Sequence, residues 1–226
     1  MSKVLVVYSG GLDSTVLLKK ILDEHDEVVA INFNYKSKHN ASERKAAEKI
    51  CKKLNVVLTE VDLPFINDLF KSDLLKSGGD IPEGHYEAEN MKSTVVPFRN
   101  GIMLSIAVGY AESIAASTVC LANHFGDRAI YPDCSMEFIE AMADAAFLGT
   151  YKKIKLLAPF TKIRKEEVVK LGLEINAPME MSWSCYKGGK VHCGVCATCE
   201  ERKTSFYLNG IKDPTDYLDP ERHFDS

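Results

Sequence analysis

The sequence predicts an α/β protein built on a Rossmann-like parallel sheet with helices on both faces. Short apolar runs of strand length alternate with amphipathic stretches of helix length along most of the 226 residues. The first apolar run, 4–8, leads into the turn Ser9-Gly10-Gly11-Leu12-Asp13-Ser14, and a helix-like stretch follows at 15–22. A strand, a glycine turn and a helix in this order form an anion-binding unit at the carboxyl edge of a parallel sheet.

The remaining elements are expected in regular alternation. Further strands are predicted at 28–33, 55–61, 118–122 and 155–159, and further helices at 40–54, 98–116, 135–148 and 161–171. Ser135 is expected to cap its helix, and Gly149 and Gly172 to end theirs. The segment 76–93 is rich in glycine and proline and poor in apolar residues, which favours a loop able to act as a lid.

Length and composition indicate one large domain over 1–226. Hydrophobic residues make up 46% and charged residues 27% of the chain, and the net charge is −4. This charge offers no general attraction to nucleic acid or to an anionic membrane. Because no run reaches the ~18 apolar residues of a membrane span and no signal peptide is evident, we expect a cytoplasmic protein without nucleic-acid or membrane partners. Its seven cysteines are then expected to be free, metal-bound or catalytic.

The turn at 9–14 has the composition of a phosphate cradle. Backbone N–H groups at a helix start and the helix dipole both favour an anion, and the two glycines permit positive φ and close approach. The hydroxyls of Ser9 and Ser14 add donors, and Asp13 either faces a phosphate-bound Mg²⁺ or caps the helix. We therefore expect ATP to be bound by Tyr8, Ser9, Gly10, Gly11, Leu12, Asp13, Ser14 and Thr15.

Four cysteines near the C-terminus predict a structural zinc site in a segment of about 180–205. They are Cys185, Cys193, Cys196 and Cys199, the last three at successive C-x-x-C spacings. Four thiolates complete a closed tetrahedral Zn²⁺ shell. Free thiols, a redox pair, an iron–sulfur cluster and replacement of one cysteine by His192 are the alternatives.

Other polar residues follow predicted strands or begin predicted helices. Arg99 and Asn100 either hold a phosphate or carboxylate, or form a helix cap with a surface arginine. His124 and Asp127 follow the strand at 118–122 and are expected at the site, although a lone loop histidine also suits the surface. Lys162 is a candidate phosphate contact because a base at a helix start opposes the dipole.

Aromatic residues near small polar groups form two further candidate segments. They are Tyr131-Pro132-Asp133-Cys134 and Trp183-Ser184-Cys185-Tyr186. Such aromatic side chains either stack on a flat heterocycle or pack around the metal site.

The strand–SGGLDS–helix unit resembles the PP-loop ATP pyrophosphatase superfamily. Further segments are similar, in order, to the 7-cyano-7-deazaguanine (preQ0) synthases: 93–101, 129–134, 159–173, 182–186 and 193–199. The similarity extends from about residue 4 to 202. It implies an adenine nucleotide alpha hydrolase-like fold, one structural zinc per subunit and a homodimer.

The resemblance also implies a reaction. ATP with Mg²⁺ would adenylate 7-carboxy-7-deazaguanine, ammonia would form the amide, and a second ATP would activate the amide for dehydration to the nitrile. The overall type is a carbon–nitrogen ligase. We expect catalytic roles for Ser9, Asp13, Ser14, Arg99 and Lys162, and substrate contacts from Arg99, Asn100, His124, Asp127, Tyr131 and Asp133.

Two departures from the family pattern lie near the expected substrate. The family commonly has H-A-G-D-H where this chain has 124–128 as His-Phe-Gly-Asp-Arg, and an arginine where it has Ser135. A deazaguanine-transferring relative therefore stays an alternative. A tRNA thiolation enzyme is disfavoured by the acidic charge, and a non-catalytic zinc module by the intact loop. Because 226 residues leave no room for a glutaminase domain, ammonia is expected to be free or supplied by a partner.

Overall fold

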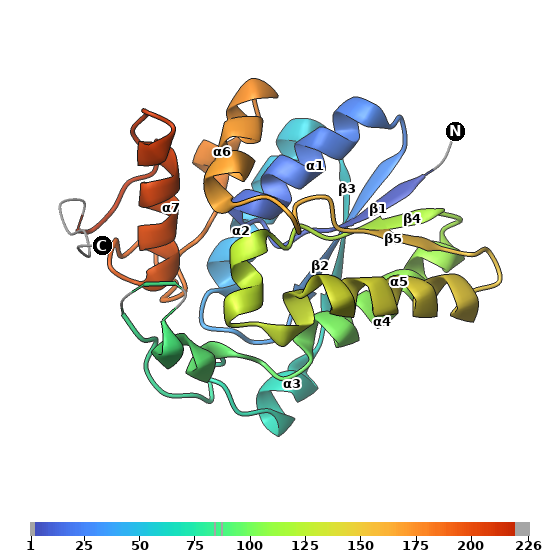
Figure 1. Ribbon diagram of the computed structural model, residues 1–226, viewed down its shortest axis with the longest axis horizontal. Coiled ribbons are helices and arrows are strands. Elements are labelled where there is room, and N and C mark those ends of the chain that lie inside the picture. Colours follow the sequence, from blue (N-terminus) through green and yellow to red (C-terminus); the bar gives the residue numbers. More distant parts are fainter. Residues whose placement is uncertain (1–2, 84, 87, 220–226) are drawn as a thin grey trace.

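A computed structural model describes residues 3–83, 85–86 and 88–219 (Figure 1). Over these residues the chain forms one parallel sheet in the order β3-β2-β1-β4-β5. The strands are β1 (Val4–Val7), β2 (Val28–Asn34), β3 (Val57–Asp62), β4 (Thr118–Cys120) and β5 (Lys155–Leu157). The strand order reverses between β1 and β4, which is where sheets of this topology bind ligands.

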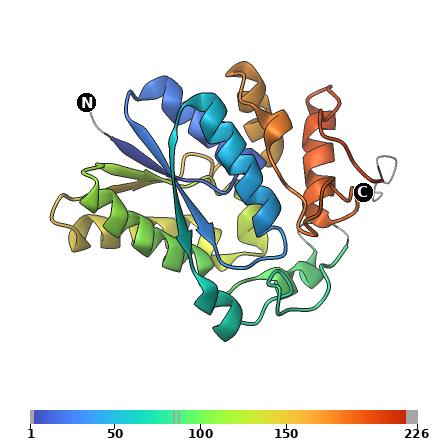
Figure 2. The same cartoon turned by 180° about the vertical axis from the view of Figure 1, so that it is seen from behind.

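Helices cover both faces of the sheet, as Figures 1 and 2 show. One face carries α1 (Leu12–Glu24), α2 (Asn40–Leu54) and α6 (Lys165–Glu174), and the other carries α4 (Arg99–Ser113) and α5 (Met136–Gly149). The short α3 (Pro64–Leu69) follows β3, and α7 (Ala197–Leu208) packs beside α6. The α/β fold with helices on both faces is confirmed.

Alternating residues of the strands supply two apolar cores. In β1, Leu5 packs with the α4 and α5 face, whereas Val4 and Val6 pack with the α1, α2 and α6 face. All three side chains are buried, because a central parallel strand has no solvent face. Cys51 and Cys120 lie in the second core, as their positions in apolar runs predict.

Several predicted boundaries agree closely with the structure. The helix expected at 40–54 is α2, and Ser135 caps α5 by accepting a hydrogen bond from the Phe138 N–H at 3.2 Å. The predicted strand at 55–61 begins later, because Asn55 takes a left-handed conformation that ends α2. The strands expected at 118–122 and 155–159 are shorter, since they pair with each other over three residues.

The helix predicted at 161–171 is wrong at both ends. Helix α6 begins at Lys165, where the Glu167 carboxylate accepts a hydrogen bond from the Arg164 N–H at 2.7 Å. Gly172 lies within the helix and does not end it. Its missing side chain leaves space for Met179 and Val16, which a Cβ would approach to 2.5 and 2.8 Å.

The segment expected as a loop at 76–93 is irregular up to residue 88, with residues 84 and 87 outside the described part of the chain. It then forms a 3-10 helix at Glu89–Thr94. Glu83 pairs with Cys196 in an isolated bridge and accepts a hydrogen bond from the Lys187 ammonium at 2.7 Å. The segment therefore contacts the C-terminal cysteine region. Among the described residues, the structure has no helix both long and apolar enough to cross a membrane.

Candidate functional site

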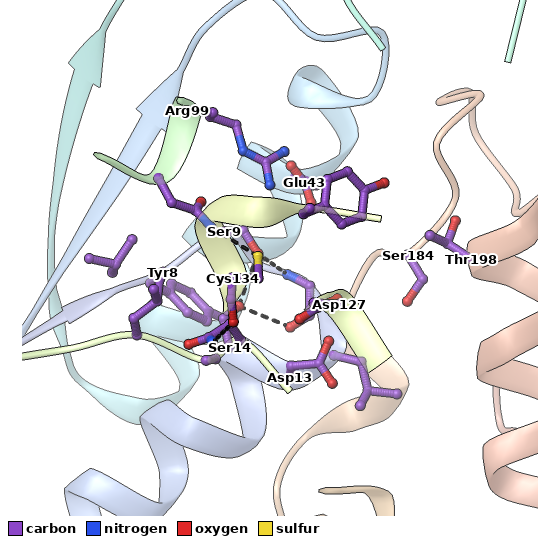
Figure 3. Close-up of a pocket in the computed structure, with 18 of the residues that line it drawn as sticks. Tyr8, Ser9, Asp13, Ser14, Glu43, Arg99, Asp127, Cys134, Ser184 and Thr198 are labelled. Atoms are coloured by element: carbon purple, nitrogen blue, oxygen red, sulfur yellow. Dashed lines mark hydrogen bonds between the residues drawn. The ribbon is translucent and has the colours of Figure 1, made fainter. Parts of the chain in front are cut away.

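A cavity of about 220 Å³ opens at the carboxyl edge of the sheet, beside the point where the strand order reverses. Residues that follow β1, β2 and β4 line it, together with the start of α4 and parts of the C-terminal segment. Figure 3 shows Asp13 and Asp127 facing the same space, with Ser184 and Thr198 across it and Arg99 above. The structure thus brings together segments that are far apart in the sequence.

Of the two glycines in the turn between β1 and α1, Gly10 occupies a position that requires glycine. Gly10 has a φ of +88°, and a Cβ there would lie 2.4 Å from the Glu43 carbonyl oxygen and 2.8 Å from the Ala47 nitrogen. Gly11 has an ordinary φ of −75° and is the N-cap of α1. Of these two glycines, which both permit positive φ, Gly10 alone adopts it. Gly10 serves for close packing against α2.

Serine hydroxyls of the turn itself hold it in place through short-range hydrogen bonds. Ser9 Oγ accepts a hydrogen bond from the Gly11 N–H at 3.0 Å and lies 3.0 Å from Ser14 Oγ. Within the described residues, no side chain caps α1, so the first amides of the helix are available to an anion. The turn therefore has the backbone and hydroxyl groups that the predicted phosphate cradle needs, while phosphate binding itself stays a prediction.

Three residues predicted to bind nucleotide support the turn from below. Tyr8, Leu12 and Thr15 are fully buried, and the Tyr8 hydroxyl lies 3.2 Å from Thr15 Oγ1. Thr15 donates a hydrogen bond to the Gly11 carbonyl at 2.8 Å. These contacts set the height of the turn above the sheet.

Asp13 forms a charged cluster that sequence reasoning only partly foresees. Its carboxylate accepts a hydrogen bond from Lys165, which also lies 3.6 Å from Glu201. Burial alone would raise the pKa of Asp13, but the neighbouring Lys165 ammonium lowers it below its ordinary value, with help from His124. Asp13 is therefore ionised at neutral pH.

Lys165, and not the predicted Lys162, reaches the cavity. Lys162 is exposed on the turn before α6 and does not line the cavity, whereas Lys165 is the first residue of the helix and does. The difference follows from the later start of α6. Lys162 lies in the turn before the helix, so its side chain points in another direction from that of Lys165. Glu201, two residues after the last cysteine, also lines the cavity, and sequence reasoning did not single it out.

Arg99 is directed into the cavity and is not a surface residue. Its guanidinium donates a hydrogen bond to the Tyr35 hydroxyl at 3.3 Å and lies 5.8 and 5.9 Å from the ring centres of Tyr35 and Tyr131. No carboxylate among the described residues forms an ion pair with it. A cationic fork held between aromatic rings is suited to a carboxylate or phosphate ligand.

Asn100 and Asp133 fix the start of α4. The Asp133 carboxylate accepts a hydrogen bond from the Asn100 N–H at 2.8 Å, and the Asn100 side chain donates to the Asp133 carbonyl at 3.1 Å. Phe98, in a left-handed conformation, is the N-cap, so the alternative of a cap by Asn100 is wrong. Asn100 lines the cavity, whereas Asp133 does not. Asp133 therefore positions the helix that carries Arg99.

His124 and Asp127 form a compact turn after β4. Asp127 accepts hydrogen bonds from the His124 N–H at 2.8 Å and from the Tyr86 hydroxyl at 2.9 Å. The His124 side chain is only 2% exposed, so the surface alternative for this histidine is wrong. Asp127 and Tyr131 line the cavity, while His124 lies behind them.

The four cysteine sulfurs converge on one point. All lie within 4.8 Å of one another, with Cys193 and Cys199 at 3.9 Å and Cys185 and Cys196 at 4.0 Å. Thiolates that share one Zn²⁺ at about 2.3 Å lie roughly 3.8 Å apart, so the cluster has the geometry of a tetrahedral metal site. Ligands of an iron–sulfur cluster bind separate irons and lie farther apart. His192 is not a fifth member, since its Nε2 accepts a hydrogen bond from the Ser184 N–H at 3.0 Å.

The cysteine cluster also builds one wall of the cavity. Trp183, Ser184 and Tyr186 adjoin Cys185, and Thr198 lies between Cys196 and Cys199; all four line the cavity. The Trp183 ring packs against His192 with centres 4.2 Å apart, whereas Tyr186 stacks on His39 at 5.1 Å. These aromatics therefore pack beside the cysteine cluster and also line the cavity, while their expected stacking on a flat heterocycle stays a prediction.

A buried arginine links this wall to the rest of the C-terminal segment. Arg202 is fully buried and pairs with Asp213 at 2.9 Å. It also donates hydrogen bonds to Ser182 Oγ at 2.7 Å and to the Met179 carbonyl at 2.9 Å. These bonds join α7 to the chain that precedes Cys185. The backbone N–H of Trp183 in turn donates a hydrogen bond to the Gly10 carbonyl at 2.9 Å, which connects the wall to the phosphate cradle.

Comparison with known proteins identifies the family. The family described as "Queuosine biosynthesis protein QueC" matches residues 3–210. This chain belongs to the QueC family. Among its relatives, a 7-cyano-7-deazaguanine synthase of Porphyromonas gingivalis is 49% identical over 94% of this chain and 96% of its own length. Another of Desulfotalea psychrophila is 48% identical over 95% and 98%.

Solved structures with low sequence identity share the fold of this QueC family member. The U34-tRNA thiolase NcsA from Methanococcus maripaludis, described with its [4Fe-4S] cluster, has a TM-score of 0.50 and 20% identity over 82% of this chain and 62% of that one. A predicted tRNA methyltransferase subunit from Methanocaldococcus jannaschii has a TM-score of 0.50 and 15% identity over 100% and 93%. These likenesses concern the fold alone and carry no information on substrate.

Proposed function

We propose that this protein converts 7-carboxy-7-deazaguanine and ammonia into 7-cyano-7-deazaguanine, with two molecules of ATP consumed per product. The proposal makes it an ATP-dependent carbon–nitrogen ligase of queuosine biosynthesis. The observation that carries it is the cavity in which the 9–14 cradle faces Arg99, in a chain whose relatives are named for this synthesis.

The cradle would hold the pyrophosphate end of ATP. First-turn amides of α1 and the Ser9 and Ser14 hydroxyls supply donors, and Asp13 would hold Mg²⁺. The second carboxylate oxygen of Asp13 is buried and has no hydrogen-bond partner in the described chain, which fits a cation ligand. When bound, Mg²⁺ would neutralise phosphate charge.

Arg99 would orient the substrate carboxylate toward the α-phosphate. Its guanidinium lies between Tyr35 and Tyr131, where a flat deazaguanine would also find aromatic surface. Attack by a carboxylate oxygen expels pyrophosphate and forms an acyl adenylate. Ammonia then displaces AMP to give the amide. Adenylation of the amide oxygen by a second ATP, followed by loss of AMP and protons, leaves the nitrile.

The cysteine cluster would hold one structural Zn²⁺ per subunit. A closed shell of four thiolates leaves no open coordination position, so the metal would order the cavity wall and take no part in the chemistry. We also propose a homodimer. Apolar side chains at the end of α5 and in the following turn, Leu148 and Tyr151, are 74% and 96% exposed.

The test is incubation with 7-carboxy-7-deazaguanine, Mg-ATP and ammonium, followed by mass spectrometry. We expect two AMP per nitrile formed. Absence of both AMP and nitrile would refute the proposal, and AMP with amide alone would indicate a relative that stops halfway. Asp13→Ala and Ser14→Ala should abolish AMP formation while zinc content stays at one per chain.

A further inference from the structure

His39 and Glu43 form a polar pair in the wall of the cavity, at the start of α2. His39 Nε2 lies 3.3 Å from Glu43 Oε2, one helical turn away. A Cβ on Gly11 would lie 3.8 Å from the other carboxylate oxygen, so Glu43 reaches the phosphate cradle. Figure 3 shows Glu43 directed toward the same part of the cavity as Arg99. The pair therefore adjoins both the cradle and the cationic end of the cavity.

Aromatic side chains connect His39 to the Arg99 end of the cavity. The Tyr186 ring stacks on the imidazole with centres 5.1 Å apart, and the Tyr186 hydroxyl lies 3.4 Å from that of Tyr131. The Tyr131 ring centre in turn lies 5.9 Å from the Arg99 guanidinium. His39 thus adjoins the part of the cavity where the substrate carboxylate is proposed to lie.

One ring nitrogen of His39 has no hydrogen-bond partner within the described chain. The side chain is only 3% exposed, and the unpaired atom is Nδ1, which is buried. His39 is the N-cap residue of α2, yet its side chain does not cap the helix. Because a buried polar atom without a partner costs stability, we expect the ligand of the cavity to supply one.

Glu43 determines which nitrogen of the ring carries the proton. A carboxylate only accepts hydrogen bonds, so it favours the tautomer with the proton on Nε2 and leaves a lone pair on Nδ1. Among the described residues, Glu43 forms its ion pair with His39 alone. Its charge therefore stabilises the imidazolium that forms when Nδ1 takes up a proton.

We propose that His39 is the catalytic base of this site, and that its Nδ1 accepts the protons that the reacting nitrogen loses. Glu43 is the positioning residue that holds the imidazole in the required tautomer. The inference rests on the proposed function, since it names the base for that reaction.

The other ionisable groups around His39 are poorly suited to this role. Arg99 does not give up its proton in proteins. Burial raises the pKa of the Tyr35 hydroxyl above its ordinary value, and Glu43 adds to this effect despite Arg99, so the phenol stays neutral. Tyr186 presents the face of its ring to the imidazole, and not its hydroxyl. A neutral imidazole backed by a carboxylate is the stronger base among these groups.

Ammonia loses all of its protons on the way to the nitrile. Its attack on the acyl adenylate gives an adduct whose NH₃⁺ group transfers one proton to Nδ1, and the C–O bond to AMP breaks with its electron pair going to the phosphate oxygen. After the second adenylation, the C(=NH₂⁺)–O–AMP group gives a proton to Nδ1 and becomes a neutral imidate. Transfer of the last N–H proton turns that bonding pair into the third C–N bond as AMP leaves. His39 passes each proton to water between steps.

The first experiment removes the base and keeps a polar side chain. The amide of His39→Asn cannot take up a proton, so amide formation from ammonia should fall by about 100- to 10,000-fold, the range for general acid–base catalysis. ATP–pyrophosphate exchange with 7-carboxy-7-deazaguanine needs no proton transfer and should stay near the wild-type rate. The adduct of hydroxylamine is more acidic than that of ammonia and loses its proton to water, so AMP release with hydroxylamine should fall much less.

The second experiment tests the positioning residue. In Glu43→Gln an amide N–H can face Nε2 and move the ring proton to Nδ1, so kcat for amide formation should fall with little change in the KM for ATP. Glu43→Asp keeps a carboxylate and should recover part of the activity. His25→Asn is the matched control, because His25 ends α1 and does not line the cavity, and it should keep wild-type activity. Zinc content and melting temperature confirm that each variant is folded.

The outcomes separate this inference from the proposed function. Wild-type protein without pyrophosphate exchange would refute the function itself. Normal exchange in His39→Asn with an unchanged rate of amide formation would overturn the inference alone. Loss of exchange in the folded variant, or equal losses with hydroxylamine and ammonia, would also overturn it, since His39 would then serve binding or structure. If His39→Asn does not fold, unchanged amide formation in Glu43→Gln would have the same consequence.

Discussion

The two sides of the cavity are built by opposite strategies. The phosphate cradle consists of consecutive residues, and its Ser9, Gly11 and Ser14 groups bond to partners two to five positions away. The opposite wall joins 183–186 to 198–201, segments brought together by the cysteine sulfurs and by buried Arg202. Local bonds make the cradle robust, whereas the wall depends on the four-cysteine cluster and a buried ion pair. Substitutions in the wall should therefore lower stability, whereas substitutions in the cradle should lower ATP chemistry.

Loss of a metal ligand should have the largest effect on the wall. Cys193→Ser is expected to release zinc and to lower the free energy of unfolding by on the order of 5 kcal/mol, since structural zinc binding is worth about 10–16 kcal/mol in zinc-finger peptides. Metal analysis with chemical denaturation measures both effects. Cys51→Ser is the control, because Cys51 lies in the core away from the cluster, and its zinc content should remain at the wild-type level. Full zinc retention in Cys193→Ser would contradict the four-cysteine assignment.

Removal of the buried arginine should damage the same wall without touching the metal. Arg202→Met leaves Asp213 buried without its partner and should cost about 3–5 kcal/mol of unfolding free energy. Arg44→Met, at an exposed position on α2, is the matched control and should leave stability nearly unchanged. Urea denaturation of the zinc-loaded variants tests this, and equal stability of the two variants would show that Arg202 does not hold the wall.

Disruption of the cradle should affect ATP chemistry more than metal binding. In Gly10→Ala the new Cβ would meet the Glu43 carbonyl at 2.4 Å, so the turn must shift from its phosphate-binding form. We expect AMP formation to fall by about 100- to 1,000-fold, which is the effect of losing one preorganised hydrogen-bond donor in an active site. Zinc content should stay unchanged.

Gly109→Ala is the glycine control for that variant. A Cβ there meets nothing within 4 Å, and alanine in mid-helix should stabilise α4 by about 0.5–1 kcal/mol. An active Gly10→Ala protein would show that the cradle tolerates the displaced turn.

The smallest effect is expected at Ser135, which does not itself line the cavity although the preceding Cys134 does. Ser135→Ala removes the cap of α5 and should lower the free energy of unfolding by about 1 kcal/mol. Ser135→Asp keeps an acceptor for the Phe138 N–H and should retain wild-type stability. Thermal denaturation distinguishes the two, and neither variant should alter zinc content or AMP formation.

Sequence reasoning succeeded where a feature is encoded locally. The cradle, the α2 helix and the Ser135 cap all depend on residues within a few positions, and the cysteine spacing predicted that the four cysteines cluster. It failed where a side chain's direction depends on a distant segment. Lys165 lines the cavity in place of the predicted Lys162, because α6 starts later than its pattern suggests. Asp133, predicted to contact substrate, instead accepts a hydrogen bond from the start of α4.

The sequence by itself determined the fold class, the glycine turn between the first strand and helix, the four cysteines that cluster and the family resemblance. These depend on periodicity, on local hydrogen bonds and on the spacing of a few residue types. Only the tertiary structure decided that Glu201, Lys165 and Asp13 meet and that the cysteine cluster forms a cavity wall. Burial and charge pairing between distant segments produce these contacts, as between Lys165 and Asp13, 152 positions apart, and no local pattern of residues records them.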